Sequence, residues 1–151
     1  MNKKKIPTNG SIHITTDRSK MDIDLIYNFL TNAYWSTGKP KWVVKKSIKN
    51  SLCFGVFYKN QQVGFARVIT DYVTFAYIAD LFILEEFRGK GISKLLIKHI
   101  LEYKKLIKMK KWILATKDAH ALYEKFGFEV VKDSKKYMEL ISENAYDIPV
   151  K

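Results

Sequence analysis

Apolar residues recur along the chain at two spacings, and each spacing predicts a different kind of element. Between residues 22 and 33, Ile23, Ile26 and Leu30 fall on one helical face, which predicts an amphipathic helix. The same periodicity predicts a longer helix over residues 91–108. Shorter apolar runs predict strands at residues 11–15, 52–58, 62–69, 74–83 and 111–116.

The rest of the chain predicts two short helices and two closing strands. One helix covers residues 41–49; another carries Tyr123, begins near Asp118 as its N-cap and ends at Gly127. Strands near residues 128–131 and 136–141 finish the chain. The resulting order, β-α-α-β-β-β-α-β-α-β-β, predicts an α/β fold with one central mixed sheet flanked by helices.

The length of the chain, 151 residues, predicts a single domain. Residues 1–10 are basic and contain the breakers Pro7 and Gly10, so we expect a flexible tail followed by one domain over residues 11–151. The sequence contains no run of about 20 apolar residues, so it predicts no membrane span. The basic N-terminus lacks the apolar segment of a secretion signal, which favours a cytoplasmic location.

Cysteine usage favours the same location, because a single cysteine, Cys53, excludes an intrachain disulfide. Its apolar setting between Leu52 and Val56 favours a buried thiol over a nucleophile. No cluster of His, Cys and Asp shows the spacing of metal ligands, so we expect no metal.

The net charge of +12 raises the question of an anionic partner. Among 27 basic residues only Arg18, Arg67 and Arg88 are arginines, whereas nucleic-acid readout usually depends on arginine forks. The lysines are spread along the chain, as on a solvated surface. We therefore expect no nucleic-acid partner, and we retain attraction of phosphate groups as a use for part of the charge.

The segment from Leu81 to Ser93 carries the most specific chemistry. An apolar strand is followed by Arg88 and a turn with two glycines, which opens directly into the predicted helix. Such a turn exposes backbone N–H groups at a helix N-terminus to an anion. The fingerprint of dinucleotide-binding folds fails here, because Lys94 stands where its third glycine belongs. A pyrophosphate fits the turn and its arginine.

Arg88, Gly91 and Ser93 match the pattern Arg/Gln-x-x-Gly-x-Gly/Ala, with Ser93 as a small polar departure at its last position. In this the segment resembles the cofactor motif of the GNAT superfamily of acyl-CoA-dependent N-acetyltransferases. Residues 122–128 resemble the family's Leu-Tyr-x-Lys-x-Gly-Phe segment, and the resemblance extends over about residues 12–138. It is closest to small single-domain bacterial members, whose sheet is mostly antiparallel.

The resemblance implies an N-acetyltransferase that uses acetyl-CoA and acetylates a primary amine of a small molecule or protein by direct transfer. The alternative is a non-catalytic acyl-CoA-binding regulatory module. We expect a monomer or homodimer. The resemblance assigns the pyrophosphate and pantetheine of the cofactor to Leu81, Phe82, Ile83, Arg88, Gly89, Lys90, Gly91, Ile92, Ser93 and Thr116.

Two residues are candidates for catalysis. Tyr123 falls on the family tyrosine that lies near the thioester sulfur, where a phenol can protonate a departing thiolate; alternatively, it packs in the core. Asp80 lies among apolar residues on the same strand face as Phe82, where a carboxylate is either functional or paired. It is a candidate base or anchor for a water relay, or the buried partner of Arg67.

The acceptor pocket is expected between the first helices and the last strands, as in the family. Aromatic side chains near Asp71 and Asp80 predict a flat or cationic amine. The candidate lining residues are Tyr34, Trp35, Phe75, Tyr77, His120 and Tyr137.

Overall fold

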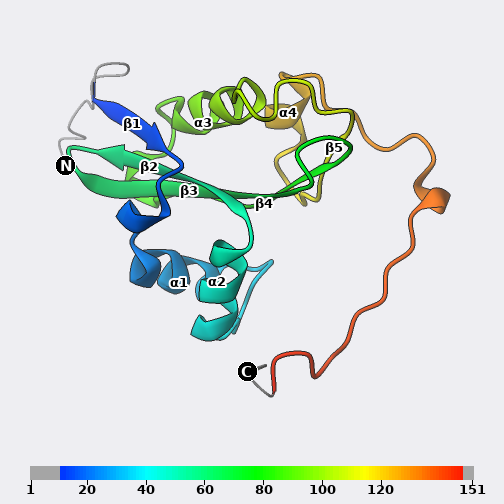
Figure 1. Cartoon of the computed structure of the whole chain (residues 1–151), viewed down its shortest axis with the longest axis horizontal. Helices are drawn as coiled ribbons and strands as arrows, with labels where there is room; N and C mark the ends of the chain where they lie inside the picture. Colours follow the sequence, from blue (N-terminus) through cyan, green and yellow to red (C-terminus); the bar gives the residue numbers. More distant parts are fainter. Residues whose placement is uncertain (1–10, 148–151) are drawn as a thin grey trace.

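The computed structural model describes residues 11–147, which form one five-stranded sheet covered by helices on both faces (Figure 1). The strands follow the order of the chain and pair antiparallel, except that the last pair is parallel. This confirms the predicted mixed, mostly antiparallel sheet. The strands are β1 (Ile12–Thr15), β2 (Leu52–Tyr58), β3 (Gln61–Thr70), β4 (Ala76–Ile83) and β5 (Trp112–Leu114).

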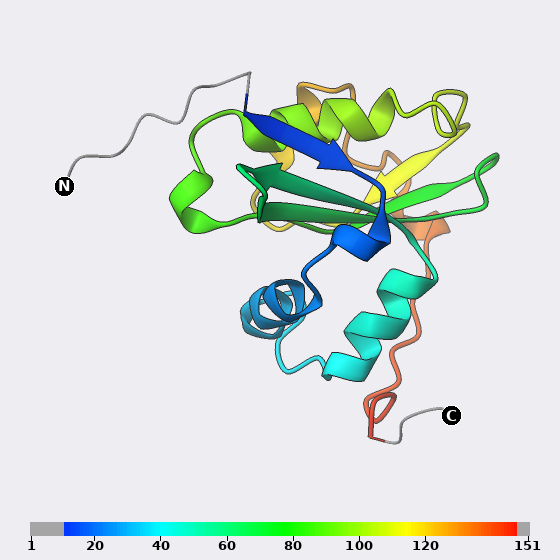
Figure 2. The same cartoon turned by 60° about the vertical axis from the view of Figure 1, so that its left-hand side comes forward.

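The helices divide between the two faces of the sheet (Figure 2). One face carries α1 (Ile23–Asn32) and α2 (Lys41–Lys49), and the other carries α3 (Ile92–Leu101) and α4 (His120–Glu124). Three short 3₁₀ turns are η1 (Arg18–Lys20), η2 (Glu85–Phe87) and η3 (Ser134–Lys136). Within residues 11–147 no helix is long and apolar enough to cross a membrane.

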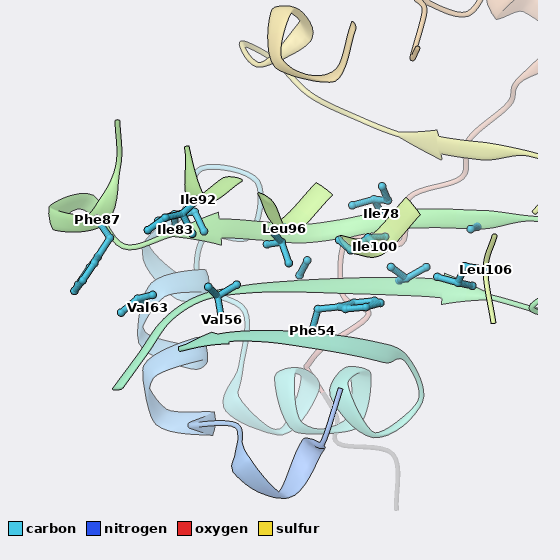
Figure 3. Packing of buried hydrophobic residues seen from close by; sticks show 13 residues of the cluster. Phe54, Val56, Val63, Ile78, Ile83, Phe87, Ile92, Leu96, Ile100 and Leu106 are labelled. Atoms are coloured by element: carbon cyan, nitrogen blue, oxygen red, sulfur yellow. The ribbon is translucent and has the colours of Figure 1, made fainter. Parts of the chain in front are cut away.

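Each face of the sheet has its own hydrophobic cluster. Figure 3 shows the larger one, in which Phe54 and Val56 of β2 pack with Leu96 and Ile100 of α3. The second cluster joins the opposite face of the sheet to α1 and α2, through residues such as Phe82. The apolar faces that the amphipathic patterns of the sequence predicted are buried in these two clusters.

A bulge in β4 interrupts the sheet next to the candidate site. Phe82 pairs with Phe65 and Ala79 pairs with Arg67, so Asp80 and Leu81 together oppose the single residue Ala66. Asp80 adopts a φ of 54°, in the left-handed region that few non-glycine residues enter. The bulge allows Ile78 to pack with the α3 cluster, whereas Phe82 packs with the α1 cluster.

The predicted helix over residues 91–108 is too long. The helix ends at Leu101, and a turn in which the N–H of Leu106 donates to the carbonyl of Tyr103 follows it. This turn buries Leu106 and leaves Ile107 64% exposed, whereas a continuous helix would place Ile107 on the same face as the buried Ile100. Helical periodicity could not reveal that the helix ends at Leu101, because the position of the break depends on which side chain fits the core.

The two predicted closing strands are also wrong within the described residues. Residues 128–131 and 136–141 form no ladder with the sheet, and every residue from 129 to 147 is exposed. A strand pattern shows only which residues could pair, because pairing also needs a partner strand. The described residues after α4 pair with no strand of the sheet. The predicted tail over residues 1–10 lies outside the described residues, as do residues 148–151.

Candidate active site

A cleft opens where β4 and β5 separate. The two strands pair only from Ala76 to Ile78 on β4, and beyond Ile78 no strand of the described residues continues on that side. A cavity of about 1130 Å³ occupies the space, lined by the rest of β4, the turn after it, the end of α1 and the start of α4. An open strand edge in a cleft can pair with the amides of an extended ligand.

The turn between Arg88 and α3 forms one end of the cleft. Gly89 and Gly91 have φ values of 72° and 77°, which glycine adopts without steric cost. Gly91 is the N-cap of α3 and provides no side-chain cap, so the first N–H groups of the helix are available to an anion. A Cβ at either glycine would meet nothing within 4 Å, so the backbone conformation, rather than crowding, requires glycine here.

Arg88 lines the same end, and its Nε donates to the carbonyl oxygen of Ile83 over 2.9 Å. This bond fixes the guanidinium beside the end of β4. Lys90, in contrast, donates to the carbonyl of Glu86 over 3.1 Å and does not line the cleft. The cofactor residues predicted from the sequence that do line it are Leu81, Phe82, Ile83, Arg88, Gly89, Gly91, Ile92, Ser93 and Thr116.

Tyr123 lines the cleft from α4. Its side chain is 8% exposed and packs edge-on against Phe128, with ring centroids 5.7 Å apart. Burial, and secondarily the nearby Tyr34 phenol, raises the pKa of Tyr123 to about 12. The phenol therefore keeps its proton throughout the physiological pH range.

The predicted N-cap of α4 is wrong. Asp118 makes no cap and lines the cleft; Thr116 Oγ1 instead accepts from the backbone N–H of Ala119 over 3.0 Å. The position of Thr116, two residues after β5, allows it both to fix the start of α4 and to face the cleft.

Asp80 is the centre of an ionic network at the opposite end of the cleft. Its Oδ2 accepts from Arg67 Nε over 2.9 Å, and its Oδ1 accepts from the indole N–H of Trp35 over 3.3 Å. Lys39 Nζ lies 4.0 Å from Oδ1, and the Asp80 side chain is only 4% exposed. The predicted ion pair between Asp80 and Arg67 is therefore present. The network also connects the loop between α1 and α2 to the bulge of β4.

The predicted acceptor residues separate into two groups. Tyr34, Trp35 and Tyr77 line the cleft, whereas Phe75, His120 and Tyr137 do not. His120 faces a second, smaller cavity. Asp71 does not line the cleft either. Its carboxylate accepts from the Thr74 hydroxyl and from the N–H groups of residues 73–75 within its own turn, and these hydrogen bonds hold the pKa of Asp71 well below its usual range.

Phe29 and Asn32 also line the cleft, although no chemical signal in the sequence pointed to either residue. Phe29 stacks on Phe82, with ring centroids 3.8 Å apart and the rings almost parallel. The amphipathic pattern of α1 marked its core face only, and no motif surrounds Asn32.

A family model described as an acetyltransferase (GNAT) domain matches residues 49–130. A protein of Gibberella zeae described as an acetyltransferase is 30% identical over 104 residues, covering 56% of this chain and 59% of the fungal protein. The matched region thus spans less than two thirds of that relative.

Solved structures agree with these matches. A crystal structure from Xanthomonas campestris pv. campestris, described as an acetyltransferase of the GNAT family, is 40% identical, with a TM-score of 0.86 over 92% of this chain and 99% of that one. A GNAT acetyltransferase from Elizabethkingia anophelis with acetyl-CoA bound shares the fold at 23% identity, with a TM-score of 0.64 over 90% and 91% of the two chains.

Proposed function

The chain belongs to the GNAT family of acetyltransferases, and from that premise we propose that it transfers an acetyl group from acetyl-CoA directly to a primary amine of a small molecule or protein. Acetyl-CoA is the cofactor of this family. The observation that carries the proposal is the cleft itself, in which an uncapped helix N-terminus, Arg88 and an open strand edge lie together.

The residues of the cleft fit acetyl-CoA from end to end. The amides between Arg88 and Ser93 and the Arg88 guanidinium suit a pyrophosphate. The open edge of β4 from Ala79 to Ile83 suits the amides of a pantetheine arm, and Thr116 offers a hydroxyl on the facing side. The bound cofactor would supply the thioester whose acetyl group the amine attacks.

Tyr123 is our candidate general acid. Its buried phenol lines the cleft and holds a proton on Oη, which a departing sulfur would accept. Burial makes the phenol a weaker acid, but it also makes a thiolate more basic.

Direct transfer is supported by the position of Cys53. The thiol is 1% exposed, its Sγ donates to the carbonyl of Ile48 over 3.6 Å, and the residue does not line the cleft. A protonated thiol outside the cleft has no route to an acyl group. Cys53→Ala should therefore retain turnover.

Asp80 is a candidate base or anchor for a water relay, because an alkylammonium with a pKa of about 10.4 must lose a proton before it attacks. Its pairing with Arg67 equally fits a structural role. Tyr34, Trp35 and Tyr77 supply aromatic surface beside Asp80 that suits a flat or cationic amine.

Calorimetry with acetyl-CoA, followed by a panel of amines assayed by release of the CoA thiol, tests the function. We expect micromolar-range binding and thiol release with at least one class of amine. Folded protein that does not bind acetyl-CoA would contradict the proposal. Binding without turnover on aminoglycosides, polyamines, amino acids or protein amines would instead favour the regulatory module.

A further inference from the structure

Arg67 of β3 lines the end of the cleft that contains Asp80, and the protein uses only part of its guanidinium. Its Nε donates to Asp80 Oδ2 over 2.9 Å, and its Nη1 donates to Ser51 Oγ over 3.2 Å. Its Nη2 has no hydrogen-bond partner among residues 11–147. In that range Ser36 Oγ is the only sealed side-chain N or O atom without a partner, so Nη2 remains accessible to a ligand.

Lys39 brings a second cation to the same carboxylate. Its Nζ lies 4.0 Å from Asp80 Oδ1, although the residue does not line the cleft itself. The indole N–H of Trp35 also donates to Oδ1, so both oxygens of Asp80 already face donors. One carboxylate therefore stands against two cations, in side chains that are at most 15% exposed. Buried charges are normally balanced, so this cluster has one positive charge in excess.

The other charged groups around the cleft do not remove this excess. Arg88 lies at the other end, beside the turn that suits a pyrophosphate. Asp118 lines the cleft but is exposed, and it is followed back along the chain by Lys117, whose Nζ lies 5.6 Å from the centroid of the Tyr34 ring. Lys117 offsets the charge of Asp118, so the surroundings of Asp80 stay positive.

We propose that the amine acceptor carries a carboxylate, as an amino acid does, and that Arg67 Nη2 and Lys39 Nζ bind this carboxylate. The inference rests on the acetyl transfer to an amine proposed above. A carboxylate can accept from a guanidinium and an ammonium at once, and it neutralises the excess charge. A polyamine or an aminoglycoside carries only positive charge, so it would add to the excess and bind poorly.

The aromatic side chains of the cleft then hold the rest of the acceptor. Tyr34 and Trp35 lie between the Asp80 cluster and the start of α4, where Trp35 donates to Asp80 and Tyr34 contacts Lys117. Their faces suit the ammonium or an apolar side chain of an amino acid. In the reaction the neutral amine forms an amide bond, the C–S bond of acetyl-CoA breaks, the amine loses a proton and the thiolate gains one. The carboxylate stays unchanged.

Calorimetry on protein saturated with CoA tests the site without turnover, because CoA carries no acetyl group. The probes are matched pairs that differ by the carboxylate: leucine, phenylalanine and lysine against isoamylamine, phenethylamine and cadaverine. In at least one pair the amino acid should bind roughly 10- to 150-fold more tightly, the range that one charged hydrogen bond provides. Equal affinities in every pair, tighter binding of the decarboxylated amines, or no binding of any amino acid would overturn the proposal.

Lys39→Met removes the excess charge and leaves the pair of Asp80 with Arg67 in place. The preference for the amino acid should fall by about tenfold in this variant, with CoA affinity unchanged. The control is Lys45→Met, which removes the same charge from an exposed position on α2 and should keep the preference. Lys39→Gln repeats the test with a polar side chain if Lys39→Met does not fold. Equal losses at positions 39 and 45 would overturn the proposal.

Release of the CoA thiol from acetyl-CoA separates this inference from the proposed function. Acetyl transfer to amines without any preference for a carboxylate would overturn the inference and leave the proposed function intact. Carboxylate-dependent binding to the complex with CoA, without thiol release from acetyl-CoA on any of the same amines, would contradict the acetyl transfer and support the carboxylate site.

Discussion

At the end of the cleft that contains Arg88, the strand edge, the arginine and the helix N-terminus come from one contiguous stretch of chain, whereas the opposite end draws its side chains from separate segments. Residues 81–93 provide the strand edge, the arginine and the helix N-terminus of the cofactor end. The opposite end, to which we assign the amine in our proposal and which we call the acceptor end, combines Asp80 of β4 with Arg67 of β3 and with Trp35 and Lys39 of the loop after α1.

The two ends also differ in what maintains their shape. The cofactor end depends on two glycines at positive φ and on backbone N–H groups, which are properties of the local chain. The acceptor end depends on a buried carboxylate that three side chains from other elements surround. Substitutions at the cofactor end should therefore change affinity for acetyl-CoA, and those at the acceptor end should change stability and the handling of the amine.

The largest expected effect is at Tyr123. Tyr123→Phe removes the phenol hydroxyl and keeps the ring packed against Phe128, so turnover should fall by about 10² to 10⁴ while acetyl-CoA affinity stays within a few-fold. Steady-state kinetics and calorimetry measure the two quantities. Because the pKa of Tyr123 is raised to about 12, the wild-type enzyme should lose no activity below pH 10 through ionisation of this phenol.

Tyr137→Phe is the matched control, since Tyr137 does not line the cleft. Near-normal turnover in Tyr123→Phe would leave solvent as the proton source. A large loss of acetyl-CoA affinity would instead make Tyr123 part of the binding surface.

Asp80→Ala should destabilise the fold by about 3–5 kcal/mol, because it leaves the Arg67 guanidinium without its carboxylate in a side chain that is 12% exposed. Urea denaturation measures this loss. Replacing both partners, as in Arg67→Met with Asp80→Leu, should restore most of the stability. Full stability in Asp80→Ala, with turnover lost, would point to a base rather than a structural pair.

Arg88→Ala should weaken acetyl-CoA binding by about 1.5–3 kcal/mol, or roughly 10- to 150-fold, because it removes a charged donor at the cofactor end. Calorimetry measures the affinity. Lys90→Ala removes a neighbouring charge that lies outside the cleft and should have a much smaller effect. Equal losses in both variants would mean that net charge, and not the position of Arg88, attracts the cofactor.

The smallest expected effect is at the acceptor end. Trp35→Phe removes the indole donor to Asp80 and keeps an aromatic ring beside Phe29. The free energy of unfolding should therefore fall by about 0.5–1.5 kcal/mol, the contribution of one hydrogen bond. The acceptor KM should rise a few-fold with acetyl-CoA affinity unchanged, and Trp42→Phe on α2 serves as the control. A matching loss of acetyl-CoA affinity would contradict the separation of the two ends.

Sequence patterns predicted the helices and strands best where one face of the element is buried along its whole length. The bounds of α2 and β2 match their predictions, and those of β3 differ by one residue at each end. The prediction failed at residues 102–108, where a turn selects Leu106 for the core, and at residues 128–131 and 136–141, where a strand pattern meets no partner.

The sequence by itself determined the cofactor end, because a glycine turn before an amphipathic helix fixes its geometry through local φ and ψ angles. It also marked Asp80, a carboxylate among apolar residues, as a chemically unusual position, and the resemblance to the family singled out Tyr123. Only the tertiary structure decided what surrounds Asp80, since Trp35 and Lys39 lie more than 40 residues away along the chain. Contacts across such separations depend on how β4 bulges and where α1 ends, which local spacing does not encode.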